Sequence, residues 1–207
     1  MSGRAAIDVV HAPGWETQFG WAELPEALWL EQGRLARLLV GVLPYSSKAW
    51  AVFADVGGQA HLICVLDGVV RRLGGVSDCW RFDRMATVVY AGSDRVLPSF
   101  AQVAERYAVE VVVCPACRPS RNAVYFSRLA GARRAVTCAD DACKLDEARK
   151  VNGIGPSREG AVEKADDLIA RRWWRNAAVA AQAQAQASLD AFLASTGDAR
   201  TRRIDGA

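Results

Sequence analysis

Residues 14–25 read GWETQFGWAELP, an alternation of apolar and polar side chains that contains a bare glycine at position 20. Such alternation predicts a β-strand with one buried face, because successive side chains point to opposite sides of a sheet. Gly20 lies in the middle of this predicted strand without a side chain, which raises the question of what it does there.

Two further apolar segments, residues 35–43 and 49–56, follow after short turn-like breaks and predict three successive strands together with residues 15–24. Apolar periodicity and turn signals divide the rest of the chain into alternating elements. These patterns predict a helix over 58–75, a strand over 78–84, a helix over 98–108, a strand over 109–115 and a helical run from about 157 to 197.

This order of elements predicts an α/β fold, in which helices flank a mixed sheet. It matches the RNase H-like fold, although many α/β folds share the order at this level of detail. The predicted organisation has a core in two parts with a Cys/Arg-rich insertion before the last core helices. Its segments are a flexible N-terminus 1–13, a first core part 14–119, the insertion 120–155, C-terminal core helices 156–203 and a tail 204–207.

The overall composition is that of an ordinary globular protein, with 207 residues, 51% hydrophobic and 24% charged. Its net charge of +3 is too small to demand a polyanionic partner by itself. The N-terminus lacks the apolar run of a signal peptide, and no segment is long enough to span a membrane. We therefore expect a cytoplasmic protein without a membrane partner, whose six cysteines are thiols or metal ligands rather than disulfides.

Two acidic residues stand where such a fold would hold metal ligands. Asp83 ends the strand in WRFDRMATV, and Glu163 lies in the first turns of the last helical run, in SREGAVEKADD. Phosphoryl transfer by two Mg²⁺ ions about 3.5–4 Å apart uses carboxylates, because this ion prefers oxygen ligands. Taken singly, each residue is more simply explained as a cap or a solvated charge.

Four segments together resemble the catalytic core of IstA-type insertion-sequence transposases, which are DDE transposases with a retroviral-integrase-like core. They are GWETQFGWAELP, RLGGVSDCWRFDRMATVV, PSREGAVEKADDLIARRWWRN and LDAFLASTGDARTR. The resemblance covers most of residues 14–203 except about 120–155. It implies a DNA partner, DNA integration and recombination with Mg²⁺ or Mn²⁺, and catalytic, metal-binding roles for Asp83 and Glu163.

The first acid of the family pattern, Q-x-D-W, falls on Gly20, although Gln18 and Trp21 on either side fit the pattern. Loss of one carboxylate from a two-metal site weakens metal binding and misplaces what still binds. We therefore expect the catalytic activity of this chain to be lost or severely impaired.

Three neighbouring acids are candidates to replace the missing carboxylate. Glu16 shares the face of Gly20 but lies about 13 Å away along the strand. Glu23 is an odd number of residues from Gly20, so it points to the other face. Asp55, on the third strand, remains a candidate substitute that the sequence does not place.

Cysteines in and just before the insertion form two close pairs about 20 residues apart, a spacing that suits a structural Zn²⁺ site. They are Cys114, Cys117, Cys138 and Cys143. The alternative is that these are free cysteines in an insertion without a metal. The other two cysteines, Cys64 and Cys79, are predicted to be buried as small apolar side chains.

Two groups of basic residues are candidates for DNA contacts. The insertion carries arginines with interleaved aromatics, as phosphate contacts and base stacking require. The groups are Arg118, Arg121, Arg128, Arg133 and Arg134 in the insertion, and Lys164, Arg171, Arg172 and Arg175 on the last helical run. A solvated loop accounts equally well for the first group, and at least one of Trp173 and Trp174 is expected in the core.

Three interpretations remain open from the sequence. The first is an integrase-like core that binds DNA, with impaired catalysis; the family relation adds an ATPase helper and self-association as candidate partners. The second is a non-catalytic DNA- or protein-binding module that works through a zinc-stabilised, arginine-rich insertion. The third is a decaying gene product, because a fold persists after its function is lost.

Overall fold

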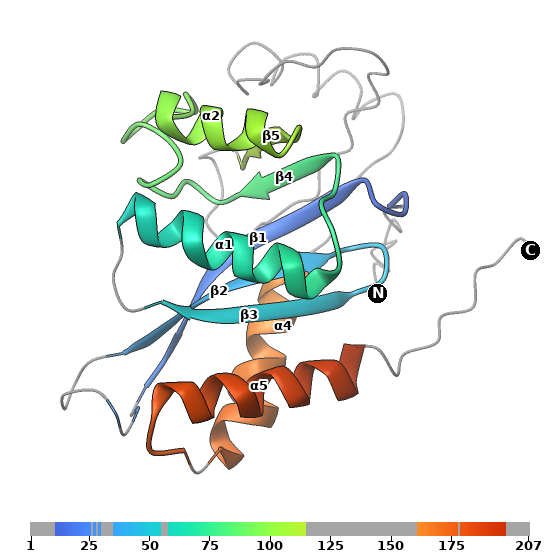
Figure 1. The fold of residues 1–207 in the computed structure, drawn as a ribbon, viewed down its shortest axis with the longest axis vertical. Coiled ribbons are helices and arrows are strands. Elements are labelled where there is room, and N and C mark those ends of the chain that lie inside the picture. The colour runs from blue at the N-terminus through green and yellow to red at the C-terminus, as the bar shows by residue number, and fades with distance from the viewer. Residues whose placement is uncertain are drawn as a thin grey trace, which may run out of the picture.

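The computed structural model describes residues 11–25, 27, 29, 35–54, 58–114, 161–177 and 179–197. Its strands form one sheet in the order β3-β2-β1-β4-β5 (Figure 1). They are β1 (Glu16–Leu24), β2 (Ala36–Leu43), β3 (Lys48–Ala54), β4 (Cys79–Phe82) and β5 (Glu110–Val113). The first three strands pair antiparallel, and β4 and β5 run parallel to β1, so the predicted mixed sheet is confirmed.

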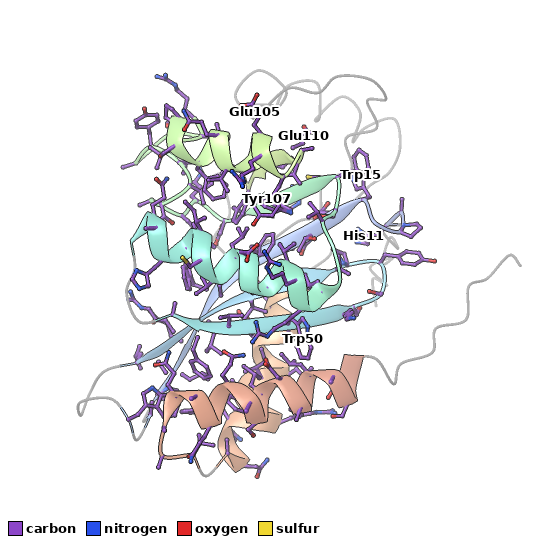
Figure 2. The ribbon with its side chains drawn as sticks, in the orientation of Figure 1. His11, Trp15, Trp50, Glu105, Tyr107 and Glu110 are labelled. Carbon is purple, nitrogen blue, oxygen red and sulfur yellow. The ribbon has the colours of Figure 1, made fainter. Side chains whose placement is uncertain are left out.

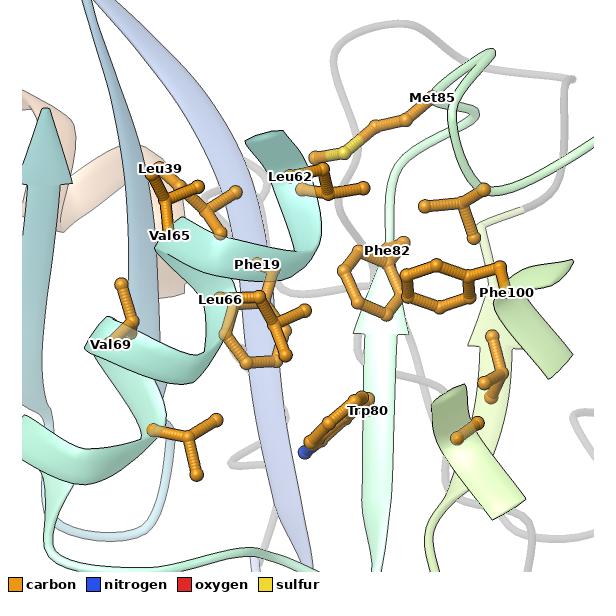
Figure 3. Packing of buried hydrophobic residues seen from close by; sticks show 14 of the residues in the cluster. Phe19, Leu39, Leu62, Val65, Leu66, Val69, Trp80, Phe82, Met85 and Phe100 are labelled. Atoms are coloured by element: carbon orange, nitrogen blue, oxygen red, sulfur yellow. The ribbon is translucent and has the colours of Figure 1, made fainter. Parts of the chain in front are cut away.

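Helix α1 (Gln59–Leu73) covers one face of the sheet, because its apolar residues recur every three or four positions. They pack on Phe19, Trp80 and Phe82 of β1 and β4 (Figure 3). The rings of Phe19 and Phe82 stack with centroids 5.1 Å apart, and Trp80 meets Phe19 edge-on at 5.8 Å. Gly74 ends the helix in the left-handed conformation, as the paired glycines after this helix predict.

Helix α2 (Pro98–Arg106) packs on the same face, where Phe100 meets Phe82 edge-on with ring centroids 5.2 Å apart. Tyr107, labelled in Figure 2, follows this helix. Its hydroxyl donates a hydrogen bond to Asp67 Oδ1 of α1 at 2.6 Å. The two helices are thereby fixed to each other as well as to the sheet.

The C-terminal helical segments pack on the opposite face of β1, β2 and β3. In Figure 1, α1 passes in front of the sheet and α4 passes behind it. The segments are α4 (Ala161–Leu168), a π-helical turn η1 (Ile169–Trp173), a 3₁₀ turn η2 (Trp174–Asn176) and α5 (Gln182–Gly197).

The prediction of one helical run from about 157 to 197 is wrong within the described residues. The chain becomes extended at Ala177, with ψ 101°, and helix α5 begins anew at Gln182. Alanine and glutamine give no local reason to stop a helix. Tertiary packing decides instead, because the break allows α5 to lie along β3 and bury Leu189 and Leu193.

Helix α5 also caps the edge strand β3, whose outer backbone groups need partners. The Gln186 side chain accepts a hydrogen bond from Phe53 N–H at 2.9 Å and donates one to Ala51 C=O at 3.0 Å. Asp190, one turn on, accepts from Gln186 at 2.7 Å and pairs with Arg72 of α1 at 3.1 Å. We call Gln186, Asp190 and Arg72 the edge clasp.

The two remaining cysteines differ in their exposure to solvent. Cys79 is buried as predicted, but Cys64 is exposed, because it lies off the buried stripe of α1 that contains Leu62 and Val65. Within the described part of the chain, no helix is long and apolar enough to cross a membrane. The insertion 120–155 and Asp55 lie outside the described residues.

Candidate active site

The register of β1 and β4 brings Gly20 and Asp83 to the same level of the sheet. These strands pair in parallel from Glu16 opposite Cys79 to Phe19 opposite Phe82, and Gly20 and Asp83 are the next residues. Paired positions on neighbouring strands lie about 5 Å apart across the ladder. Asp83 follows β4 directly and is exposed to solvent, so this acid is accessible where the resemblance requires one.

Helix α4 packs against β1 at Gly20. A Cβ atom added to Gly20 would lie 2.6 Å from Cγ1 of Val162, which is closer than real Cβ contacts allow. The Val162 side chain is buried and fills the volume that any side chain at position 20 would use. The glycine in the opening strand thus permits a close approach of α4, and an acid there would have to displace Val162.

Glu163, the next residue on α4, is half-buried at this approach. Asp166 lies one turn further along the same helix, and its Oδ1 is buried without a hydrogen-bond partner in the described residues. Burial raises the pKa of Asp166 to about 7, and the charges of Glu163 and Asp167 add to this effect. Helix α4 therefore carries an acidic flank beside Val162, although only Glu163 was selected from the sequence.

Glu16 cannot replace the missing acid, because buried partners hold both of its carboxylate oxygens. Arg81 Nε lies 2.8 Å from Glu16 Oε1, and the side chains of this ion pair are 5% and 3% exposed. Arg81 Nη2 bonds the other oxygen at 3.2 Å, and Gln18 Nε2 donates to Oε1 at 2.8 Å. Burial opposes the charge of Arg81, but the charge and hydrogen bonds of Glu16 outweigh it and raise the pKa of the arginine.

Glu23 also forms an ion pair with another residue and does not face Gly20. It points away from the face of Gly20, as its position in the strand predicts, and accepts a hydrogen bond from Arg37 Nε of β2 at 3.0 Å. The candidate substitute Asp55 lies outside the described residues.

The donor set in the described part of the chain does not fit a two-metal site. No group of three or more histidine, cysteine, aspartate or glutamate side chains there is placed to hold a metal ion. At position 20, where the resemblance puts the first ligand, a glycine packs against the Val162 side chain. Of the four proposed zinc ligands, only Cys114 lies among the described residues, where it is buried at the end of β5.

The basic residues of the last helical run lie on the surface of the segment that carries Glu163. Lys164, Arg171, Arg172 and Arg175 are exposed. Arg171 Nε pairs with Asp167 Oδ1 of the preceding turn at 3.1 Å, which neutralises part of its charge. The arginines proposed in the insertion lie outside the described residues.

Solved structures with the same arrangement of strands and helices are retroviral integrase cores. A chain of the simian T-cell lymphotropic virus intasome, solved with a PP2A regulatory subunit, matches 99% of this chain at 15% identity and a TM-score of 0.55. This chain spans 56% of that viral chain. The trimeric form of the HTLV-2 integrase catalytic core domain in complex with magnesium matches 94% of this chain and 92% of its own, at 10% identity and a TM-score of 0.52.

These likenesses establish the fold of the retroviral integrase catalytic core, an RNase H-like mixed sheet flanked by helices. No protein-family model and no curated protein sequence matches the chain.

Sequence reasoning missed two side chains that shape this region, Val162 and Arg81. Both lie next to or near a selected acid, but their importance depends on contacts with β1, far away in the sequence. A signal for Arg81 was available, because an arginine and Glu16 on apolar strands predict a buried pair if the strands are neighbours.

Proposed function

We propose that this protein is an integrase-like core that binds DNA and has lost efficient strand-cleavage chemistry. The observation that carries the proposal is the packing of Val162 against Gly20, because it fills the place of the first catalytic acid with apolar side-chain volume. An accessible Asp83 and a half-buried Glu163 are the remaining acids of the ancestral site. Their ancestral role is to hold Mg²⁺ or Mn²⁺.

The acids next to the ancestral site do not replace the missing carboxylate, which supports a loss of catalytic activity. A substitute carboxylate must be free to bind a cation, yet Glu16 is held by Arg81 and Gln18, and Glu23 by Arg37. Removing one group of a catalytic set costs orders of magnitude in rate, since its members act as a unit.

DNA binding is supported by the exposed cations on the helical segment of Glu163. Arg172 and Arg175 have no carboxylate partner among the described residues, so their charge is available for phosphate contacts. Descent from an IstA-type transposase, self-association and an ATPase helper belong to the same proposal and rest on the sequence resemblance. The proposed location is cytoplasmic.

The test combines DNA binding and cleavage in one set of preparations. Labelled duplex DNA is incubated with Mg²⁺ or Mn²⁺ and the native protein, Asp83→Ala, or the pair Gly20→Asp with Val162→Ala. We expect the native protein to bind the duplex without cleavage that depends on Asp83. The paired variant has room for a carboxylate at position 20, and we expect it to nick the DNA.

The control is the paired variant with Asp83→Ala added, which should no longer nick the DNA. Cleavage by the native protein that Asp83→Ala abolishes would show that another acid completes the site. Absence of DNA binding by the native protein, over a range of salt, would refute the proposal as a whole.

A further inference from the structure

The loop that follows Asp83 folds back on itself as a short hairpin. Val89 and Val96 form an antiparallel bridge, and Tyr90 N–H donates to Arg95 C=O at 3.0 Å. Gly92 makes the turn at the tip in the left-handed region, with φ +72°. Tyr90 and Arg95 are therefore cross-strand neighbours at the end of the hairpin.

This hairpin presents an aromatic ring and a guanidinium group together on the surface. Tyr90 is 43% exposed, and the Arg95 guanidinium carbon lies 5.5 Å from the centre of its ring. Arg95 is exposed as well, and no carboxylate in the described residues pairs with it. The arginine beside the ring extends the flat surface that the hairpin presents to solvent.

The base of the hairpin packs on the core and lies close in the chain to Asp83. Val88 and Val89 are buried in the core beneath it. Arg84, the neighbour of Asp83, forms an ion pair with Asp94 at the hairpin tip. On the other side, Gln59 of α1 donates to Thr87 C=O at 2.8 Å. The pair Tyr90 and Arg95 is thus held in place without a ligand, and the ion pair ties it to the Asp83 loop.

We propose that Tyr90 and Arg95 form a stacking platform for an unpaired nucleobase of DNA bound near Asp83. The ring and the guanidinium supply the flat faces that any base can stack on, and Arg95 adds a positive charge for the flanking phosphate. A base stacked there belongs to a strand end or a distorted duplex, because paired bases are covered by their neighbours in the helix. This inference rests on the proposed DNA binding and adds the kind of DNA that is preferred.

The experiment compares a labelled single-stranded oligonucleotide with the fully paired duplex of the same sequence by fluorescence anisotropy. We expect Tyr90→Ala to weaken binding of the single strand about 5- to 100-fold and to leave duplex binding nearly unchanged. Tyr90→Phe keeps the ring and should bind like the native protein. Far-ultraviolet circular dichroism confirms that each variant is folded.

A matched control separates stacking from charge. Arg106 is exposed at the end of α2, so Arg106→Ala removes one positive charge away from the hairpin. Arg95→Ala should weaken single-strand binding more than Arg106→Ala does. As a direct probe, 2-aminopurine in the oligonucleotide should be quenched by the native protein and not by Tyr90→Ala.

The two proposals fail in different ways. If the native protein binds DNA and Tyr90→Ala binds the single strand equally well, the stacking platform is refuted and the DNA-binding function stands. If the native protein binds neither the single strand nor the duplex, both proposals are refuted.

Discussion

At the scale of single residues, Gly20 and Val162 form a coupled pair across the interface between β1 and α4. A Cβ at position 20 would meet Val162 Cγ1 at 2.6 Å, so a larger side chain at position 20 requires the Val162 side chain to shift. We expect Gly20→Ala to destabilise the fold by about 1–3 kcal/mol through overpacking, offset by about 0.5–1 kcal/mol that alanine gains over glycine in a strand. Urea unfolding of the variants measures this cost.

A double-mutant cycle tests the coupling itself. Val162→Ala alone leaves a void, but in the Gly20→Ala background the new methyl group occupies part of it. The double variant should therefore be more stable than the sum of the single changes predicts, by about 0.5–3 kcal/mol. Simple additivity would show that α4 moves away from β1 and that Val162 does not restrict position 20.

Asp166 makes the stability of the fold depend on pH. Burial, Glu163 and Asp167 raise its pKa from 3.8 to about 7, so the folded state retains a proton that the unfolded state has lost between these values. The contribution of this proton to the free energy of unfolding is fully present below pH 3.8 and is gone above about pH 7. Between these values it falls as the pH rises, with a slope of at most about 1.4 kcal/mol per pH unit. We expect Asp166→Asn to flatten the curve of unfolding free energy against pH across this window.

The control for that measurement is Asp78→Asn, which removes an exposed carboxyl just before β4. It should leave the slope across the same pH window unchanged. An Asp166→Asn variant that loses stability above this window would show instead that the ionised carboxylate serves the fold.

Much of the candidate site could be predicted from local sequence, and the rest depends on contacts between distant segments. Period-two alternation placed Glu16 on the face of Gly20 and Glu23 on the other, and strand order placed Asp83 after a central strand. Local pattern does not reveal that Val162 occupies the space beside position 20, since that contact depends on how α4 crosses the sheet. For the same reason, the sequence left open whether Glu16 was available.

At the scale of elements, the π-helical turn η1 explains how two adjacent tryptophans each form a hydrogen bond with a different part of the fold. A π turn holds one residue more than an α turn and so changes the direction of the side chains that follow. Trp173 is buried and donates from Nε1 to Ser188 Oγ of α5 at 3.1 Å. Trp174 donates to Pro25 C=O at the end of β1 at 2.9 Å. The prediction that at least one of them lies in the core is confirmed.

The edge clasp predicts a change in self-association. Gln186→Ala removes both hydrogen bonds to the backbone of β3 and leaves the strand with unpaired groups at its edge. We expect the unfolding free energy to fall by about 1–3 kcal/mol, because these backbone groups no longer have partners. Sedimentation of the variant should also show association that increases with protein concentration, because an open edge pairs with another copy.

Gln184→Ala is the matched control, since Gln184 is exposed on the same helix and the substitution changes helix propensity equally. It should behave like the native protein in both measurements. Equal effects of the two substitutions would assign the loss of stability to helix α5 itself rather than to the cap on β3.

At the scale of the whole molecule, buried hydrophobic clusters on both faces of the sheet stabilise the fold. The face covered by α1 and α2 contains the rings of Phe19, Trp80, Phe82 and Phe100. The other face brings α4 against β1, and the ancestral acids and exposed cations gather on that side or at the adjoining end of β4. Under the proposed function, loss of one acid would leave these buried clusters intact, so the fold would persist without its chemistry.

This division predicts which cations determine the salt dependence of DNA binding. Replacing Arg172 and Arg175 with alanine should make the slope of log affinity against log salt shallower by about 0.9 for each phosphate that the protein no longer neutralises. Replacing Arg71 and Arg106 on α1 and α2 removes the same charge from the other side of the sheet and should leave the slope unchanged. Duplex binding measured from low to moderate salt gives both slopes. Equal slopes for the two double variants would mean that DNA binding depends only on the net charge of the protein. The helical segment of Glu163 would then not be the surface that binds DNA.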